Sequence, residues 1–171
     1  MIRNLAHLSV LALSLCAASG AVAEEMEKLG AFNAWEAYAY TSPNQGKVCY
    51  AMARPKTSEP EGVNRDDIFF IITNRPKQGQ RNEVSTVVGY SFKKESRAQL
   101  IVGAKTYELF AVGDTAWSRD KEHDKEIIGS LKKGADMSLK GQSWRGTATT
   151  DHYSLEGVSA AVDKIDEACK E

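Results

Sequence analysis

Three residue types that hydrolases combine in a catalytic triad lie close together near the end of the chain: Asp151, His152 and Ser154. In a triad, the nucleophile, the base and the orienting acid converge on one substrate atom from separate elements. Three residues on one short corner cannot easily aim at a common atom. The spacing therefore favours structural roles, with Asp151 in a turn and Ser154 capping a helix. A hydrolase of unknown reaction built on this corner is the alternative.

The residues just before this corner have types suited to binding. Arg145 is followed by Gly-Thr at a predicted strand corner, where its guanidinium can fork onto a carboxylate such as Asp151 or Asp114. Our first interpretation is that Arg145 buttresses the corner, and recognition of an anionic ligand or partner is the alternative. The whole candidate corner or ligand contact comprises Trp144, Arg145, Thr147, Asp151, Tyr153 and Ser154.

Metal and cofactor chemistry has little support in the sequence. His123 and His152 do not stand in a cluster with ligand spacing, and His123 is expected on a solvated helix face. There is no phosphate-binding glycine loop and no nucleophile elbow. We therefore predict no catalytic residue, no metal site and no cofactor. Trp35, Trp117 and Trp144 are expected to be buried or half-buried, whereas an exposed cluster of them would mark a binding face.

Residues 1–23 have the pattern of a bacterial signal peptide. A basic residue precedes a short apolar run, and an Ala-x-Ala cleavage site occupies residues 21–23. We expect cleavage before Glu24, which gives an exported protein that is periplasmic, outer-membrane-associated or secreted. Residues 24–171 are then expected to form one domain with no transmembrane segment.

Charge and cysteine content narrow the class further. The chain has 22 Lys and Arg against 23 Asp and Glu, and this balance gives no indication of nucleic-acid binding. Of three cysteines, Cys16 lies in the predicted signal peptide, which leaves Cys49 and Cys169. An even pair in an exported protein predicts a disulfide.

The clearest periodic signal is a helix at the end of the chain. Its apolar residues follow a 3-4-3-4 spacing and so share one face: Leu155, Val158, Val162, Ile165 and Cys169. Ser154 stands where an N-cap belongs. A helix this short is marginal alone in water, so it must dock on the body of the protein and carry Cys169 inward. Cys49 lies in an apolar segment typical of a strand, which suits the predicted bond.

Most other segments are typical of strands separated by turns. Strands are predicted over residues 35–40, 48–53, 68–72, 83–92, 99–102, 105–112 and 137–142, and a turn is predicted at residues 113–114. The continuous apolar run at 68–72 suits a strand that is buried on both faces. Residues 24–30 are expected to fray, residues 56–66 to form a loop, and residues 120–133 to form a helix.

This order of elements predicts a mainly-β protein. Strands do not alternate with helices, so a parallel α/β sheet is disfavoured. We expect an antiparallel β-sandwich or a partly closed barrel, with a short internal helix and a docked C-terminal helix.

Several short motifs spread over residues 32–169 form one recognisable set: Phe32 with Trp35, Cys49-Tyr50-Ala51, Glu83-Val84-Ser85, Gly113-Asp114-Thr115-Ala116-Trp117, Ser143-Trp144-Arg145-Gly146-Thr147 and Thr150-Asp151-His152-Tyr153-Ser154-Leu155, then Cys169. Together these motifs resemble the invasion-associated locus B (IalB) family of bacterial exported proteins. The resemblance implies a β-sandwich or barrel, no known catalytic mechanism, and an association with invasion of host cells. We therefore expect an exported, non-enzymatic binding protein whose partner is a protein or an envelope or host surface.

Overall fold

The computed structural model describes residues 25–170, and the predicted signal peptide, residues 1–23, lies outside them. Within this range, eleven antiparallel strands form one sheet in the order β1-β2-β3-β5-β6-β9-β8-β7-β10-β11-β4. The strands are β1 (Glu27–Phe32), β2 (Trp35–Ser42), β3 (Gly46–Ala53), β4 (Thr57–Glu59), β5 (Phe69–Arg75), β6 (Gln80–Val87), β7 (Arg97–Val102), β8 (Lys105–Val112), β9 (Thr115–Trp117), β10 (Asp136–Gln142) and β11 (Ala148–Ser154). The 3-10 helix η1 (Pro76–Gln78) and the α-helices α1 (Lys121–Leu131) and α2 (Val158–Ala168) complete the described chain. The predicted class, mainly antiparallel β with an internal and a C-terminal helix, is confirmed.

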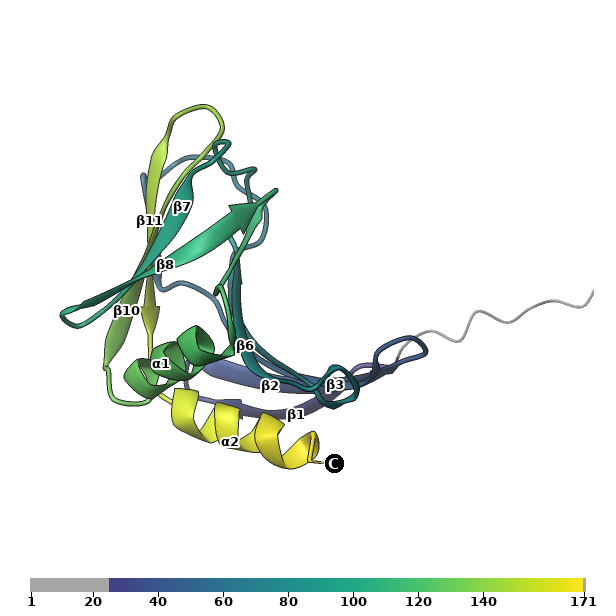
Figure 1. Ribbon diagram of the computed structural model, residues 1–171. Coiled ribbons are helices and arrows are strands. Elements are labelled where there is room, and N and C mark those ends of the chain that lie inside the picture. The colour runs from purple at the N-terminus through teal and green to yellow at the C-terminus, as the bar shows by residue number, and fades with distance from the viewer. Residues whose placement is uncertain (1–24, 171) are drawn as a thin grey trace, which may run out of the picture.

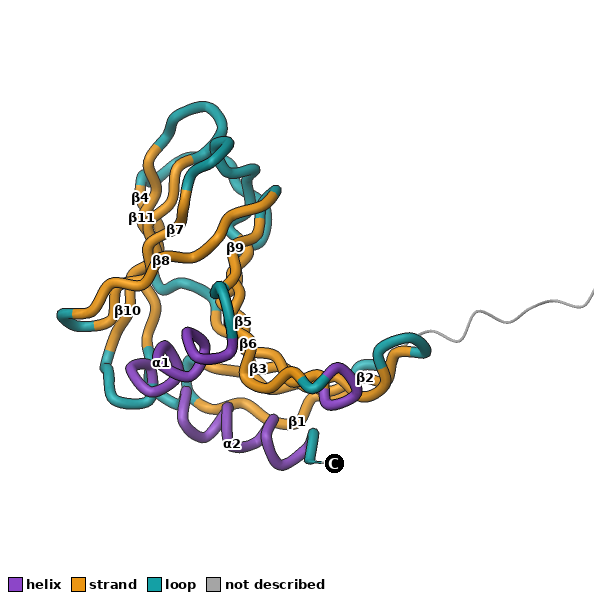
Figure 2. The backbone as a smooth tube through the Cα atoms, viewed as in Figure 1, coloured by secondary structure: helices purple, strands orange, loops and turns teal. Residues whose placement is uncertain are grey.

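The sheet curls round without closing, as Figure 1 and Figure 2 show. One part contains β1, β2, β3 and β5, the other contains β7, β10, β11 and β4, and β6, β9 and β8 connect them. Aromatic side chains fill the space where the two parts meet. The ring of Phe70 lies edge-on to Trp35 and to Tyr153, with 6.1 Å between centroids in each pair. The sheet is therefore open, and it turns inward around one shared core.

Helix α2 covers one face of β1, β2 and β3 and appears in yellow beneath them in Figure 1. The predicted apolar stripe is correct, because Val158, Val162 and Ile165 are all buried. Cys49 of β3 and Cys169 are joined by a disulfide, with their Cα atoms 6.0 Å apart across 120 residues of sequence. The bond fixes the end of the helix to the middle of strand β3, and the predicted cysteine pair is present.

The start of α2 differs from the prediction. Ser154 is the last residue of β11, and the N-cap position belongs to Gly157, which has φ 94° and offers no side chain. A Cβ at this position would lie 1.9 Å from the carbonyl oxygen of Phe32, so only glycine fits the turn. The Ser154 hydroxyl instead accepts a hydrogen bond from the Glu156 amide at 3.2 Å. The chain needs these extra turn residues to pass from the strand to the helix.

Helix α1 packs over β6 and brings polar residues into contact with it. The Asp120 carboxylate caps the helix by accepting from the His123 amide at 2.9 Å. Contrary to the prediction of a solvated face, the His123 side chain is buried against Tyr107. Asp124 accepts from the Val84 amide at 2.8 Å, and burial raises the pKa of its carboxyl group.

The structure corrects three further local predictions. Residues 27–32 form the edge strand β1 rather than a frayed end, because they pair with β2. The predicted loop over residues 56–66 contains the short strand β4, which pairs with β11. In β5, Phe69 and Ile71 are only half-buried, because the described helices cover one face of this part of the sheet. The run at 68–72 is thus not buried on both faces.

Candidate ligand-binding cleft

The strand alternation of β11 separates the three residues of the possible triad. Asp151 points into the core and is 0% exposed, whereas His152 faces the other side of the strand. The His152 ring is hydrogen-bonded to the Ser138 hydroxyl at 2.9 Å, and the Ser154 hydroxyl accepts from the Glu156 amide in its local turn. These side chains do not converge on one point, so the geometry of a Ser-His-Asp triad is not present at residues 151–154.

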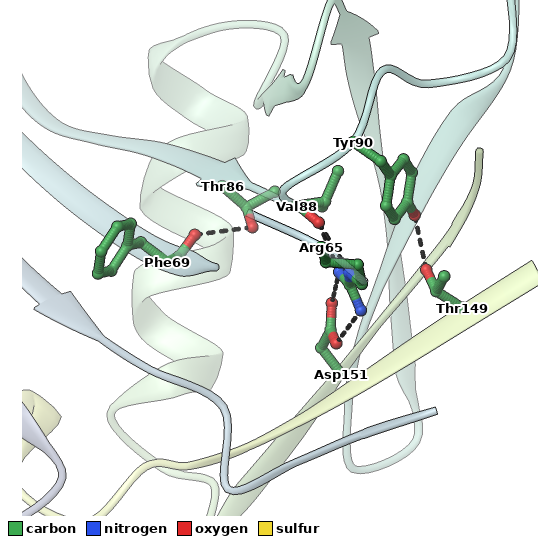
Figure 3. Close-up of polar contacts among 7 residues, drawn as sticks. All are labelled: Arg65, Phe69, Thr86, Val88, Tyr90, Thr149 and Asp151. Atoms are coloured by element: carbon green, nitrogen blue, oxygen red, sulfur yellow. Dashed lines mark hydrogen bonds and ion pairs between the residues drawn. The ribbon is translucent and has the colours of Figure 1, made fainter. Parts of the chain in front are cut away.

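A buried ion pair takes the place of that triad, as Figure 3 shows. Arg65, from the loop between β4 and β5, donates from Nη1 and Nη2 to the two carboxylate oxygens of Asp151, both at 2.7 Å. The same guanidinium also donates to the Val88 carbonyl, from Nη2 at 2.7 Å and from Nε at 2.9 Å. The two side chains are 6% and 1% exposed. Because both charges are paired and bonded, this contact can hold a polar loop against the core.

Neighbouring contacts fix the rest of that loop. The Tyr90 ring lies 5.0 Å from the Arg65 guanidinium, and its hydroxyl is 2.6 Å from the Thr149 hydroxyl in a hydrogen bond. The Asp66 amide donates to the Gly89 carbonyl at 3.0 Å. A Cβ at Gly89 would lie 2.3 Å from the Asp66 carbonyl oxygen, so this close approach requires glycine. The loop is therefore clamped onto β11 and onto the segment after β6.

The turn between β10 and β11 is equally well ordered by backbone contacts. The Ser143 amide donates to the Thr147 carbonyl at 2.9 Å, and the Gly146 amide donates to the Ser143 carbonyl at 2.8 Å. The Trp144 amide donates to the Ser91 carbonyl at 2.9 Å. With its backbone tied in this way, the turn presents the Trp144 side chain to solvent.

A cleft of about 320 Å³ lies between these two loops. We call it the Trp144 cleft, and it is lined by Val63, Asn64, Arg65, Tyr90, Ser143, Trp144, Arg145, Thr147 and Thr149. Trp144 is 63% exposed and Val63 is 42% exposed. Its lining combines aromatic faces, hydroxyl groups, an amide and the two guanidinium groups of Arg65 and Arg145, so it offers mainly hydrogen-bond donors to a polar or anionic group. The expectation that Trp144 is buried or half-buried is wrong, because the residue lies in a turn and not in a strand.

Arg145 supplies the free charge of this cleft. Its guanidinium lies over the Trp144 ring, 4.9 Å from the centroid. The sequence suggests that Arg145 pairs with Asp151. In the structure it does not, because Arg65 already binds both carboxylate oxygens of Asp151. Among residues 25–170, no acidic side chain forms an ion pair with Arg145. The positive charge therefore faces the solvent side of the cleft, where an anionic group could reach it.

The six residues proposed from the sequence thus separate into three groups. Trp144, Arg145 and Thr147 line the cleft, and Asp151 supports it through Arg65. The other two do not take part: Tyr153 is fully buried in the core, where burial raises the pKa of its hydroxyl, and Ser154 ends β11. Sequence reasoning missed Arg65, which lies in a polar loop without periodicity. The one available signal is indirect, because an aspartate at an inward position of a strand requires a buried cation.

The described residues contain neither a metal-binding cluster nor a membrane-spanning helix. Over residues 25–170 there is no cluster of three or more histidine, cysteine or acidic side chains that could hold a metal. No helix within this same range is long and apolar enough to cross a membrane.

An open antiparallel sheet with a disulfide-bonded terminal helix and a loop-built cleft defines a small mainly-β protein. The comparison with protein families gives the class a name. The model of the invasion associated locus B (IalB) protein family matches residues 35–166, and the chain belongs to this family. The matched range includes the Trp144 cleft, the Arg65–Asp151 pair and most of α2. A search of curated proteins gave no match.

Proposed function

We propose that this chain is an exported, non-enzymatic binding protein that recognises an anionic group of its partner through the Trp144 cleft. The observation behind this proposal is the pairing of an exposed tryptophan with a stacked arginine that has no acidic partner among the described residues. Exposed aromatic and arginine side chains in well-supported loops are typical of binding hot spots. The buried Arg65–Asp151 pair keeps the cleft in place before a partner arrives, which reduces the entropic cost of binding.

Export is supported by two features. The predicted signal peptide at residues 1–23 would direct the chain across the inner membrane. The Cys49–Cys169 disulfide is typical of oxidising compartments. The partner is then a component of the bacterial envelope or of a host-cell surface, and membership of the family is consistent with a role in invasion or envelope interactions.

Site-specific photo-crosslinking tests this proposal directly. A photoreactive residue at Val63, on the rim of the cleft, is placed in purified protein and exposed to isolated bacterial envelopes or to animal-cell membranes. We expect one dominant product, which Trp144→Ala and Arg145→Ala each weaken about tenfold or more. Lys140→Ala is the matched control, because Lys140 is also an exposed cation near this turn.

Charge reversal and added salt test whether the bound group is anionic. Arg145→Glu should weaken the product more than Arg145→Ala, and added salt should weaken it in the wild-type protein. Equal products from all variants, or the same product from a probe at Phe110 outside the cleft, would contradict the proposal.

A further inference from the structure

The two faces of β2 and β3 carry side chains of opposite size. On the face covered by α2, most residues of these strands are small, and Ala37, Ala39 and Ala51 are buried. Trp35, at the start of β2, is the one large side chain on this face of β2. On the opposite face, β2, β3 and the neighbouring strand β5 have bulky residues that no described helix covers. We call this side the outer sheet face and define it by Tyr38, Tyr40, Tyr50, Met52, Phe69 and Ile71. An ordinary half-exposed strand places its large apolar residues on the covered side, so this distribution indicates a second layer.

Side chains of the outer sheet face already form an ordered apolar surface. Tyr50 stacks on Tyr38 with ring centroids 5.4 Å apart, and it meets Tyr40 edge-on at 6.3 Å. Next to these rings lies a shallow groove of about 520 Å³ that continues over Met52, Phe69 and Ile71. Surfaces of this kind in soluble proteins mark sites of protein association.

The charges around this face occur in matched pairs. Lys28 pairs with Glu36, Arg75 with Glu83, and Arg54 with Asp67 at 2.9 Å. Three cations and three anions leave the rim without an excess of either sign. A strongly charged partner would therefore have no net electrostatic attraction to this rim. A second copy of the same face, related by a twofold axis, would meet no net electrostatic repulsion.

The shape of the face also suits a second copy. Strands β2 and β3 have eight residues each, which corresponds to roughly 26 Å of length, and the three neighbouring strands β2, β3 and β5 span roughly 10–15 Å. A face of this size is smaller than the ~800 Å² that each partner contributes to a standard interface, so we expect a weak association that depends on protein concentration. A twisted sheet is saddle-shaped, so two identical faces nest when their strands cross at a large angle.

We propose that two copies of this chain associate through the outer sheet face and form a β-sandwich dimer, in which the two sheets pack about 10 Å apart. The apolar run at residues 68–72 is then covered on both sides within the dimer. The Trp144 cleft lies in a different part of the chain, so the proposed dimer presents two such clefts. This inference does not depend on what the clefts bind.

Sedimentation equilibrium of the disulfide-bonded protein without residues 1–23 tests the dimer over a wide concentration range. We expect a monomer–dimer equilibrium that Tyr50→Lys weakens about tenfold or more by placing a charge at the centre of the interface. Phe110→Lys is the matched control, because Phe110 is an exposed apolar strand residue on β8 and should leave the equilibrium unchanged. A monomer at all concentrations, or a dimer that only Phe110→Lys breaks, would overturn the proposal.

Hydroxyl-radical footprinting of the wild-type protein keeps the test independent of how the variants fold. Tyr40, Tyr50 and Met26 should become protected as protein concentration rises, while Trp144 stays equally reactive. Protection that appears only with neutral phosphatidylcholine vesicles, and does not change with protein concentration, would show that a lipid surface covers this face. That result would overturn the dimer.

Discussion

The Trp144 cleft and helix α2 are each supported by a strong link between distant parts of the chain, but the links differ in kind. Arg65 and Asp151 are 86 residues apart and form a buried ion pair, whereas Cys49 and Cys169 are 120 residues apart and form a covalent bond. The disulfide acts mainly by restricting the unfolded chain. The ion pair acts in the folded state, where loss of one partner leaves a buried charge alone. The two regions should therefore respond differently to mutation.

The disulfide should give the largest single effect. Cys49→Ser with Cys169→Ser removes the cross-link, and the chain-entropy relation for a loop of this length gives a loss of roughly 4–5 kcal/mol, an upper value. Hydrogen exchange should show that α2 loosens first, while the backbone around Trp144 keeps its protection. Denatured but unreduced wild-type protein should show no reactive thiol at these positions, and two reactive thiols would contradict the bond.

Loss of the Arg65–Asp151 ion pair should have the second-largest effect on the free energy of unfolding. Asp151→Asn leaves Arg65 buried without a counter-charge, and we expect the free energy of unfolding to fall by about 3–5 kcal/mol in chemical denaturation. His152→Ala is the matched control, since His152 is the next residue and faces the opposite side of β11. We expect the control to change stability by about 0.5 kcal/mol or less and to leave binding unchanged. A measured catalytic turnover that His152→Ala abolished without loosening the fold would restore the hydrolase alternative.

Helix α2 depends on a second feature besides the disulfide, which is the close approach of Gly157 to the Phe32 carbonyl at the start of the helix. Gly157→Ala adds a Cβ in a left-handed conformation against the Phe32 carbonyl, so we expect a loss of about 2–3 kcal/mol. Ser154→Ala should cost about 0.5 kcal/mol or less, because Ser154 does not cap the helix. Thermal unfolding of both variants measures this difference, and a larger loss for Ser154→Ala would contradict the observed cap.

The ion pair between Asp166 of α2 and the exposed Arg81 should contribute less to stability than the disulfide, the buried ion pair or the Gly157 turn. Burial opposes ionisation of Asp166, but hydrogen bonds from Arg81 and Asn74 prevail and lower its pKa. A lowered pKa gives stability that is present above the unfolded value, near 4, and is lost as the pH falls through the folded value. Asp166→Asn should therefore cost about 1 kcal/mol at neutral pH, because Arg81 is largely exposed. In urea unfolding the difference from wild type should shrink in acid, and a constant difference would show that the charge has no part.

Sequence patterns predicted those features of the fold that depend on local spacing. The stripe of α2, the strand alternation and the cysteine pair were all visible because each repeats at a fixed interval or follows from the compartment. Residues 27–32 and 57–59 were missed, because they become strands only through pairing with β2 and β11. Polar edge strands have little local signal, since tertiary pairing decides them.

The candidate site was only half predictable for the same reason. Trp144, Arg145 and Thr147 belong to one continuous motif, so the sequence could group them. Arg65 comes from a loop far away in the chain, and its partner could not be found by spacing. The sequence instead suggested a nearby arginine for Asp151, whereas the structure shows that Arg145 points to solvent beside Trp144.

The most direct test of this account asks which of the two links controls binding. The photoreactive residue at Val63 is combined either with Asp151→Asn or with Cys49→Ser and Cys169→Ser, and crosslinking is measured at a temperature where all the proteins remain folded. The account predicts that the product falls about tenfold or more for Asp151→Asn, because the cleft loses its support, and stays unchanged without the disulfide. Loss of the product only in the protein without the disulfide would contradict it, because binding would then depend on α2 and not on the Trp144 cleft.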